Sequence, residues 1–359
     1  MSHPFFLPPE WAPHAATWSV WPRDDAYWSG CLAIAQADLA GFLNTLAEFE
    51  QVRVLVHDEA TKKEARSHLS DAITLHEIPN RDIWLRDSGP IFVQRDLPHD
   101  LSGNQAASAD EAELAAVSWE FNAWGDRFPW ELDNQIPDAM AKQLGLHLFY
   151  PGLILEGGSI DVNGTGLCLT TKQCLLTPSR NSHCSMAEIE TALGQYLGIT
   201  EVIWLDQGLE GDHTDGHVDT ITRFVGECTV VTSVCTDPAD ANFEPMAANC
   251  RQLEAFCDRA GQPLRVIPLP LPQQQLDFQG ERLPLTYANF YIANDVVLVP
   301  TYGDRNDELA LEVLQEAFGE GQGDRTVIGL PARGLIHGGG AFHCATQQQP
   351  KGRFWSALE

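Results

Sequence analysis

One cysteine near the C-terminal end of the chain follows a run of three glycines. The glycines at positions 338–340 let the backbone approach a ligand or a packed neighbour closely, and His343 and Cys344 come soon after them, near the end of a short apolar run. A thiolate is a competent nucleophile where nearby positive charge or backbone N–H groups lower its pKa. The residues alone leave two interpretations open for Cys344, a nucleophile or a buried structural thiol beside a tight turn.

Residues 211–219 concentrate two histidines and three aspartates. We expect a strand here, so that His217 and Asp219 project from one face and serve one site as a base and a carboxylate. His213, His217 and Asp219 could instead ligate a divalent ion. A polar loop with Asp and Gly as turn formers is the third interpretation.

Two further segments place carboxylates beside aromatic or apolar residues. In residues 82–90, alternation predicts a strand with Trp84 and Arg86 on one side and Asp87 on the other. A tryptophan ring near an aspartate suits a cation, whereas an Arg-Asp pair would be a structural salt bridge. Glu156 ends an apolar run and precedes two glycines, and because an unpaired buried charge is costly, it needs a structural donor or a cationic substrate as its partner.

The elements that would position these segments alternate between helix and strand. Apolar spacing predicts helices over residues 32–46, over 186–197 with Ser182 or Ser185 as the cap, and around Leu311, Leu314 and Phe318, with strands over residues 52–56, 202–205 and 296–299. Residues 95–112 and the proline and glutamine segment 268–275 are expected to be surface excursions, and the second should not sit inside a sheet. We therefore expect an α/β or α+β protein in which residues 1–359 form a single catalytic domain.

Charge and composition exclude several classes of partner. Twenty-two Lys and Arg against fifty Asp and Glu give a formal net charge of −28, which repels phosphate backbones and argues against nucleic acid. No run approaches the roughly 20 apolar residues of a membrane span, and residues 1–8 lack a signal-peptide pattern, so we expect a cytoplasmic protein without a membrane partner. The nine cysteines show neither zinc-knuckle spacing nor a disulfide framework.

Together, the segments resemble those of the agmatine deiminases and their bacterial peptidylarginine deiminase relatives in the guanidino-group-modifying superfamily. The resemblance covers nearly the whole chain, and its matches occur in order at Pro9-Glu10-Trp11, His14, Trp18, Trp21-Pro22, Trp84, Arg86-Asp87, Gly89-Pro90, Phe121-Asn122, Trp124-Gly125, Glu156-Gly157-Gly158, Thr214-Asp215-Gly216-His217, Asp219, Tyr287, Asn289-Phe290-Tyr291, Val299-Pro300, Gly303-Asp304, Gly338-Gly339-Gly340, His343-Cys344 and Gln347-Gln348-Gln349-Pro350. It implies a pseudo-fivefold α/β propeller, in which ββαβ modules surround a central active site.

The resemblance also implies a role for each candidate residue. Cys344 would attack the central carbon of a guanidinium, His217 would transfer protons, and Glu156 would hold His217 protonated. Substrate binding would fall to Asp87, Asp219, Trp84, Asp212 and His213. The substrate would be a small cation, agmatine and water would give N-carbamoylputrescine and ammonia, and the reaction would need no metal or organic cofactor. The chain could form a homo-oligomer.

Two departures from the family pattern bear on the substrate. His213 stands where agmatine deiminases usually carry an acidic residue, and Ala341-Phe342 stand where Asn-Ile is usual. Peptidylarginine or another guanidino compound is therefore an alternative substrate. Alternatives of other classes are a guanidinium-binding relative without turnover, and a metal-dependent hydrolase that uses His213, His217, Asp215 and Asp219.

Overall fold

The computed structural model describes residues 5–95, 112–319 and 324–355, and its strands form a two-stranded hairpin within residues 277–282 and five small sheets that share one plan. In each sheet the middle strand has an antiparallel neighbour on one side and a parallel neighbour on the other. In that order the strands are β18 (Thr346–Pro350), β1 (His14–Val20) and β2 (Val52–Val56); β4 (Ile91–Arg95), β5 (Glu113–Val117) and β6 (Leu148–Phe149); β7 (Asp161–Val162), β8 (Leu167–Thr171) and β9 (Glu201–Leu205); β10 (Thr222–Gly226), β11 (Thr229–Val234) and β12 (Arg265–Pro270); β15 (Tyr291–Ile292), β16 (Val296–Thr301) and β17 (Thr326–Pro331). The chain thus has an α/β fold.

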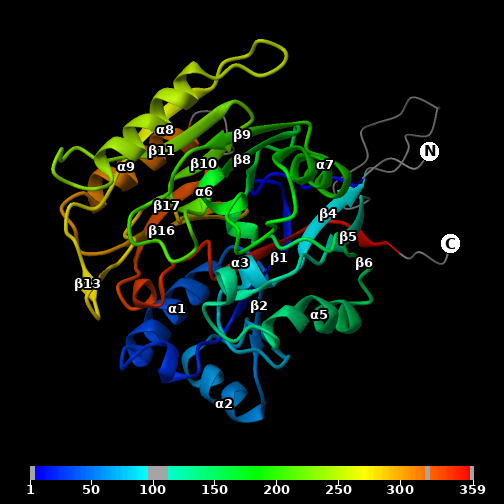
Figure 1. The fold of residues 1–359 in the computed structure, drawn as a ribbon. Helices are drawn as coiled ribbons and strands as arrows, with labels where there is room; N and C mark the ends of the chain where they lie inside the picture. Colours follow the sequence, from blue (N-terminus) through cyan, green and yellow to red (C-terminus); the bar gives the residue numbers. More distant parts are fainter. Residues whose placement is uncertain (1–4, 96–111, 320–323, 356–359) are drawn as a thin grey trace.

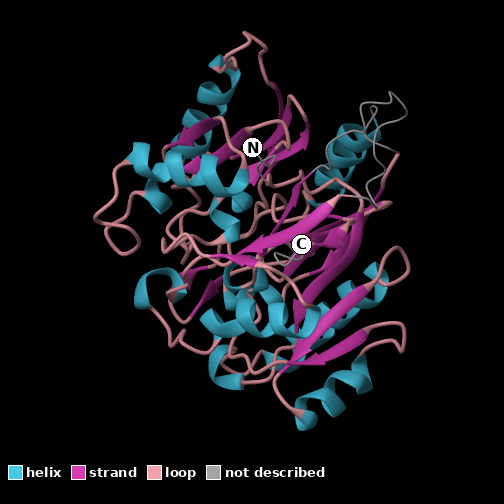
Figure 2. Cartoon of the chain, turned by 90° about the vertical axis from the view of Figure 1, so that its right-hand side faces the viewer, coloured by secondary structure: helices cyan, strands magenta, loops and turns pink. Residues whose placement is uncertain are grey.

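Helices make the crossovers that the parallel strand pairs require. They are α1 (Leu32–Leu46), α5 (Ile136–Leu144), α7 (Met186–Leu197), α8 (Phe243–Ala255) and α9 (Asp307–Gly319), while α2 (Glu59–His68) leads to an additional strand, β3 (Thr74–Glu77). Figure 1 shows α2, α5, α7, α8 and α9 at the periphery and the short helix α3 (Leu85–Ser88) near the middle. Figure 2 shows the strands lying between peripheral helices. The long helices therefore cover the sheets, and α3 lies among the strands.

The C-terminal segment ties two of the sheets together. Strand β18 runs antiparallel to β1, with Trp18 opposite Gln347, and the Trp18 Nε1 donates to Gln349 Oε1 at 3.0 Å. A few residues later β19 (Arg353–Phe354) pairs in parallel with β5. The strand that directly follows Cys344 therefore pairs with a strand from the opposite end of the chain.

Several predicted elements are confirmed. The helix over residues 32–46, the helix over 186–197 and the strand over 52–56 have the predicted bounds. Ser185 is the cap of α7, because its hydroxyl accepts from the Glu188 N–H while the Glu188 carboxylate accepts from the Ser185 N–H at 2.8 Å. The predicted strands at 202–205 and 296–299 lie within β9 and β16, and the apolar face with Leu311 lies on α9. Most of the predicted excursion at 95–112 lies outside the described residues.

The two strands predicted to carry site residues are wrong. Residues 85–88 form the single helical turn α3, in which the Gly89 N–H donates to the Leu85 carbonyl at 2.9 Å. His217 precedes the 3-10 helix Val218–Thr220, and the Thr220 hydroxyl donates to the His217 carbonyl at 2.7 Å. Both segments make short-range backbone hydrogen bonds, the Arg86 N–H also donates to the Cys344 carbonyl at 3.1 Å, and no strand pairs with either segment in the described structure.

The expectation that the proline segment stays out of the sheets is also wrong. Pro268 and Pro270 lie in β12, which pairs with β11 alone among the described strands and is an edge strand. The N–H groups of Arg265 and Leu271 donate to the β11 side, at 2.8 and 3.1 Å. Because the N atoms of successive strand residues point to opposite sides, those of Pro268 and Pro270 face the open edge of the sheet. Proline lacks an N–H group, and at this edge no inter-strand hydrogen bond is lost.

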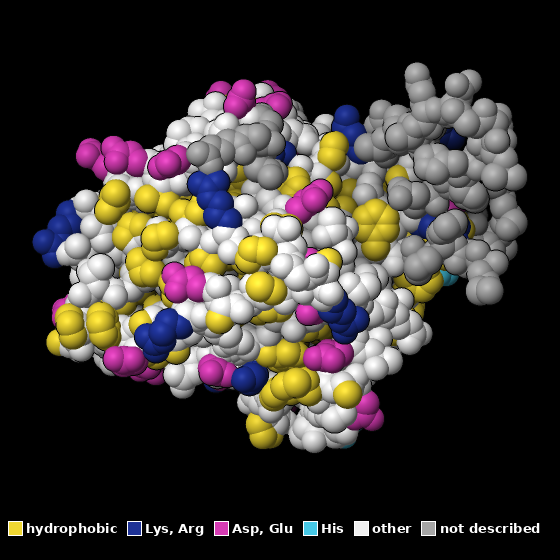
Figure 3. Space-filling view, turned by 90° about the horizontal axis from the view of Figure 1, so that it is seen from above, with side chains coloured by type: hydrophobic (Ala, Val, Ile, Leu, Met, Phe, Trp, Pro, Cys, Tyr) yellow, Lys and Arg dark blue, Asp and Glu magenta, His cyan; other side chains and the backbone are white. Residues whose placement is uncertain are grey.

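The surface carries both signs of charge. The face seen in Figure 3 shows separate groups of Asp and Glu side chains with Lys and Arg between them. Among the described helices, none combines the length and the apolar composition that crossing a bilayer would demand.

Candidate active site

Cys344 lies just before β18, and its side chain is held by Asn289. The Asn289 Nδ2 is 3.1 Å from the Cys344 Sγ, and its Oδ1 accepts from the backbone N–H groups of Ala341 and Cys344, each at 3.2 Å. Burial raises the pKa of Cys344 well above its ordinary value, and the charges of Asp219 and Asp87 raise it further. In the free protein Cys344 is therefore held as a thiol.

The glycine turn before Cys344 is required by Trp84. A Cβ at Gly340 would lie 2.7 Å from the Trp84 ring, and one at Gly338 would lie 2.8 Å from it and 2.9 Å from the Trp28 ring. These distances leave no room for a side chain. The predicted close approach of this backbone is therefore to a packed indole that itself lines the pocket above Cys344.

His217 is fully buried between two carboxylates. Its Nδ1 is 3.8 Å from an Asp87 oxygen and its Nε2 is 4.0 Å from a Glu156 oxygen. Burial alone would lower the pKa of His217, but the charge of Asp87, the Cys174 thiol and Glu156 outweigh it and hold the pKa well above the ordinary value. His217 is therefore an imidazolium at neutral pH, able to give a proton.

Asp87 is fixed by two donors that the sequence did not pair with it. The Trp124 Nε1 donates to one carboxylate oxygen and the Gly158 N–H to the other, both at 3.0 Å. Burial raises the pKa of Asp87 to about 6, Asp219 and Glu156 add to this, and His217 opposes it. Asp87 is therefore mostly ionised at neutral pH.

Gly158 marks the point where the site groups meet. A Cβ there would lie 2.6 Å from the His217 Nδ1, 2.9 Å from an Asp87 oxygen and 3.0 Å from an Asp219 oxygen. No L side chain fits at this distance from three polar atoms. The second glycine after Glu156 is therefore needed for the His217, Asp87 and Asp219 side chains to lie this close together.

Asp219 is next to the thiol and is aimed by a histidine. Its Oδ2 accepts from the His343 Nδ1 at 2.7 Å and lies 3.5 Å from the Cys344 Sγ, while its Oδ1 has no hydrogen-bond partner among the described residues. Burial would raise the pKa of Asp219, but the hydrogen bond and charge of His343 outweigh it and lower the pKa. Asp219 is thus an ionised carboxylate with one oxygen unused.

A buried ion network behind Asp219 reaches the N-terminal part of the chain. Glu10 accepts from the His343 Nε2 and from the Arg223 Nη2, both at 2.7 Å, and the Arg223 Nε donates to Asp161 at 2.7 Å. Burial would raise the pKa of Glu10, but Arg223, His343 and Arg86 outweigh it and hold the pKa well below the ordinary value. The orientation of Asp219 therefore depends on Glu10 through His343.

Replacing Glu10 with glutamine should destabilise the protein by about 3 to 5 kcal/mol at neutral pH, because it leaves buried positive charge without its partner. A depressed folded pKa contributes stability above the unfolded value of about 4.3, and this contribution is lost as the pH falls below it. In urea unfolding, the gap between Glu10→Gln and the parent should be widest near pH 7 and should narrow below pH of about 4. The exposed Glu59→Gln is the control, and a gap that does not depend on pH would contradict this account.

Arg86 and Arg180 anchor the site from behind. The Arg86 Nη1 donates to Gln347 and Gln348 at 2.9 and 2.6 Å, so the Arg-Asp pair with Asp87 weighed from the sequence does not form. The Arg180 Nε donates to Glu156 Oε1 at 2.9 Å, which gives this carboxylate the structural donor that its burial demands. Arg180 also bonds to Asp215 and to the Thr214 carbonyl, so Glu156 and the loop before His217 share one guanidinium.

Trp124 is presented by a strained turn. In α4 (Ala123–Asp126), Trp124 has φ +56° and Gly125 has φ +94°, a left-handed conformation that costs energy for a tryptophan. The Asn122 side chain holds this turn, accepting from the Gly125 N–H at 3.0 Å and donating to the Ser179 carbonyl at 2.9 Å. The strain serves to place the Trp124 N–H on Asp87.

Two predicted substrate-binding residues have other contacts. Both Asp212 oxygens are used by their own loop, which they organise by accepting from the Thr214 N–H at 2.9 Å and from the His217 N–H at 3.1 Å. His213 lines the pocket, but its Nε2 is 3.0 Å from Glu281 in the hairpin of β13 (Asp277–Phe278) and β14 (Glu281–Arg282). The Asp212 carboxylate is therefore not free to bind a substrate, and the His213 ring is already paired with Glu281.

The ligand set of the metal hypothesis does not assemble. Asp215 binds Arg180 and Arg127, and His213 pairs with Glu281 instead of approaching His217. Within the described residues, the His, Cys, Asp and Glu donor atoms close enough to share an ion belong to a different set, Glu156, Cys174 and His217, which lie within 4.8 Å of one another. The Oε1 atom of Glu156 already accepts a hydrogen bond from the Arg180 Nε.

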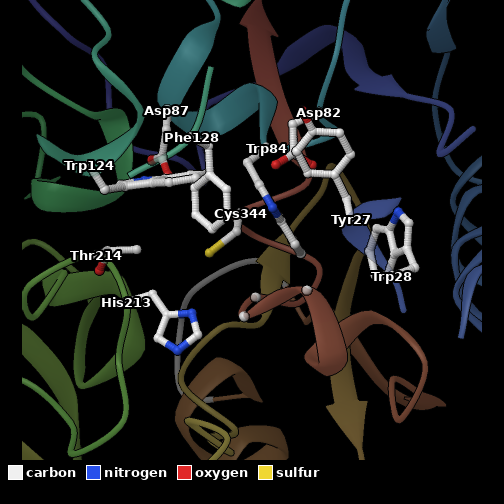
Figure 4. A pocket seen from close by; sticks show the side chains of 13 residues that line it. Tyr27, Trp28, Asp82, Trp84, Asp87, Trp124, Phe128, His213, Thr214 and Cys344 are labelled. Carbon is white, nitrogen blue, oxygen red and sulfur yellow. The ribbon is translucent and has the colours of Figure 1, made fainter. Parts of the chain in front are cut away.

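Aromatic side chains wall a pocket over the thiol, with the Cys344 sulfur facing its centre in Figure 4. Together with its open mouth the pocket encloses about 540 Å³, and its lining residues are Tyr27, Trp28, Asp82, Trp84, Asp87, Trp124, Phe128, His213, Thr214, Gly338, Gly339, Gly340 and Cys344. A pocket with aromatic walls thus lies over a thiol flanked by carboxylates. Such a site suits a cationic substrate.

A sequence model of the Porphyromonas-type peptidyl-arginine deiminase family matches residues 6–350. The chain belongs to this family. It is 36% identical to the agmatine deiminase of Ectopseudomonas mendocina over 96% of this chain and 95% of that protein. Among solved structures, the agmatine deiminase of Enterococcus faecalis is 31% identical, with a TM-score of 0.88 over 98% of each chain. The substrate-bound agmatine deiminase of C. jejuni with a cysteine-to-serine substitution is 30% identical, with a TM-score of 0.85 over 98% of each chain.

Membership of the peptidyl-arginine deiminase family confirms the resemblance read from the sequence. The structure adds roles that the motifs did not give for four residues of the matched segments: Glu10, Trp124, Asn289 and His343. Arg180 and Arg223 carried no such signal. They could have been suspected only as basic residues that must pair with buried acids.

Proposed function

We propose that this protein hydrolyses agmatine to N-carbamoylputrescine and ammonia through a covalent intermediate on Cys344. The observation that carries the proposal is the meeting of a buried thiol, an imidazolium and two carboxylates at one aromatic pocket. The likeness to agmatine deiminases over nearly the whole chain supports agmatine as the substrate.

Asp87 and Asp219 would bind the guanidinium. A guanidinium is a planar cation with N–H groups on its edges, and carboxylates pair with it through charge-assisted hydrogen bonds. The Asp219 Oδ1 is buried and unused, and Asp87 is held rigidly by Trp124 and Gly158. The indole of Trp84 would pack on the bound substrate from the side of the glycine turn.

Substrate binding would itself activate the nucleophile. The charges of Asp219 and Asp87 help to raise the pKa of Cys344, so a bound guanidinium that neutralises them favours the thiolate, and the thiol proton is released to water. The thiolate then adds to the guanidinium carbon and forms a neutral tetrahedral adduct. His217 gives its proton to one amino group, which leaves as ammonia, and a thiouronium remains on Cys344.

Water would complete the cycle through the same histidine. Neutral His217 takes a proton from water, and the hydroxide adds to the thiouronium carbon. The adduct collapses to the ureido product as the C–S bond breaks, and the hydroxyl proton restores the Cys344 thiol. Glu156, 4.0 Å from the His217 Nε2, would hold the imidazolium in place through both half-reactions. Every proton in this scheme is carried by groups of this chain, by water or by the leaving ammonia.

The five sheets support a pseudo-fivefold propeller within a single catalytic domain. In each sheet the middle strand pairs with one antiparallel strand and, after a crossover helix, with one parallel strand. This is the strand order of a ββαβ module. The site residues come from the connections between these sheets, including α3, the turn before β7, the 3-10 helix before β10 and the turn before β18. Such an arrangement brings short loops of distant sequence to one axis.

The test is ammonia and ureido-product formation from agmatine, free arginine and a blocked arginine peptide at equal concentration. We expect agmatine to be turned over at least about tenfold faster than the other two substrates. Loss of one hydrogen bond between a substrate and a charged group of the protein already has an effect of that size. Prior alkylation of Cys344 should stop the reaction, whereas a chelator should not. Faster turnover of the peptide would reassign the substrate, and loss of activity to the chelator alone would favour the metal-dependent alternative.

A further inference from the structure

Asp82 is a carboxylate at the pocket whose charge is not paired. It lines the pocket together with Asp87 and the aromatic walls, and Figure 4 places it on the far side of Trp84 from Thr214. One of its oxygens accepts from the Ile83 N–H at 2.7 Å, and within residues 5–95, 112–319 and 324–355 no Lys or Arg forms an ion pair with it. The pocket therefore holds a second acid besides Asp87.

The surroundings of Asp82 make it attract a cation. The neighbouring Asp133 accepts from the N–H groups of Arg81 and Asp82 at 2.6 and 3.3 Å, so a second carboxylate lies behind Asp82, against its backbone. Burial raises the pKa of Asp82 to about 7, and the charges of Asp133 and Asp87 contribute. A positive group placed here would relieve the repulsion within this pair.

The other candidates for a second charge contact are already engaged. The Asp212 carboxylate organises its own loop, and His213 is paired with Glu281. Aspartates 82 and 87 are then the acids that line the described pocket, and Asp87 stands beside the reacting groups. The side of the pocket at Asp82 is left for a second cationic group.

We propose that Asp82 binds the distal ammonium of the substrate, so that the pocket selects a guanidinium joined to a primary ammonium by an apolar spacer. The inference rests on the proposed function and names the residue that sets its specificity. Tyr27, Trp28 and Trp84 would pack the spacer between the two charged ends. Asp82 thereby takes the place of the acid that is missing at position 213.

The test compares agmatine with n-pentylguanidine, in which a methyl group replaces the ammonium. Asp82→Asn should lower kcat/KM for agmatine by roughly 10- to 150-fold, the range for a hydrogen bond to a charged group, mainly through KM. It should leave kcat/KM for n-pentylguanidine within about threefold of the parent value, because that substrate has no ammonium to lose. The ratio of the two values within one preparation does not depend on how much of the variant folds. The control is Asp206→Asn, which removes an exposed carboxylate outside the pocket.

The outcomes separate this inference from the function on which it rests. Equal losses for both substrates in Asp82→Asn would overturn the role of Asp82 while the deiminase activity stands. A parent enzyme that releases no ammonia from agmatine would overturn both. A pH series gives a second measurement: as the pH falls below about 7, protonation of Asp82 should raise KM for agmatine more than KM for n-pentylguanidine. Parallel KM profiles would contradict the assignment.

Discussion

Cys344→Ser should bind agmatine, fold like the parent and lose at least about 1000-fold in kcat, the scale on which removal of a nucleophile acts. A serine hydroxyl has a pKa far above that of a thiol, so substrate binding should not convert it into the anionic nucleophile. Asn289, His217 and the carboxylates stay in place, so the loss should fall on the chemical step and not on binding. Single-turnover ammonia release and agmatine binding by calorimetry measure the two effects separately.

The control for this variant is Cys257→Ser, because Cys257 is exposed and takes no part in the site. Its kcat should equal that of the parent. Mass spectrometry of the parent quenched during turnover should show the thiouronium adduct on the peptide that contains Cys344. Residual activity of Cys344→Ser within tenfold of the parent would remove Cys344 from the mechanism.

His217→Asn should lower kcat by roughly 100- to 10,000-fold, the contribution of a general acid and base. Asparagine fills a similar space but cannot give a proton to the leaving ammonia. Removal of a positive charge beside a cation site should not weaken agmatine binding, so KM should stay near the parent value or fall. The raised pKa of His217 places the alkaline limit of kcat above the ordinary histidine range, and this limit should vanish in the variant.

The exposed His183→Asn is the matched control for this loss, and its kcat and its pH profile should match those of the parent. A large increase in KM for His217→Asn would assign His217 to binding instead of proton transfer. Retention of the alkaline limit in the variant would assign that limit to another group. Either result would leave the role of Cys344 intact, since the two residues are tested by different measurements.

The arrangement links substrate charge to reactivity. In the free protein the positive charge of the imidazolium lies beside the negative charges of the carboxylates, Asp219 is ionised and Cys344 is protonated. A cation that enters between Asp87 and Asp219 changes this balance and favours the thiolate. A neutral compound of the same shape would leave the thiol protonated. Under the proposed mechanism, reactivity would therefore arise together with binding of the correct charge.

The sequence by itself determined the candidate residues and many of the elements. The types of Cys344, His217, Asp87, Asp219 and Glu156 made them candidates for a reactive site, and their resemblance to the agmatine deiminase motifs implied reaction at a guanidinium carbon. Helices α1 and α7 followed from apolar spacing and a cap, which are local signals. The alternation of helices and strands predicted an α/β or α+β protein, and the parallel strand pairs of the structure decide for α/β.

Only the tertiary structure decided where the site segments lie and in what state they are charged. Residues 82–90 alternate like a strand, but residues 85–88 form α3, because no strand of the described residues pairs with them and Arg86 anchors them to β18. The pairing of Glu10 with His343 spans 333 positions, and no local pattern specifies such a contact. Protonation states follow from burial and from neighbours of distant sequence, so the imidazolium at His217 and the unpaired acid at Asp82 exist only once the chain is folded.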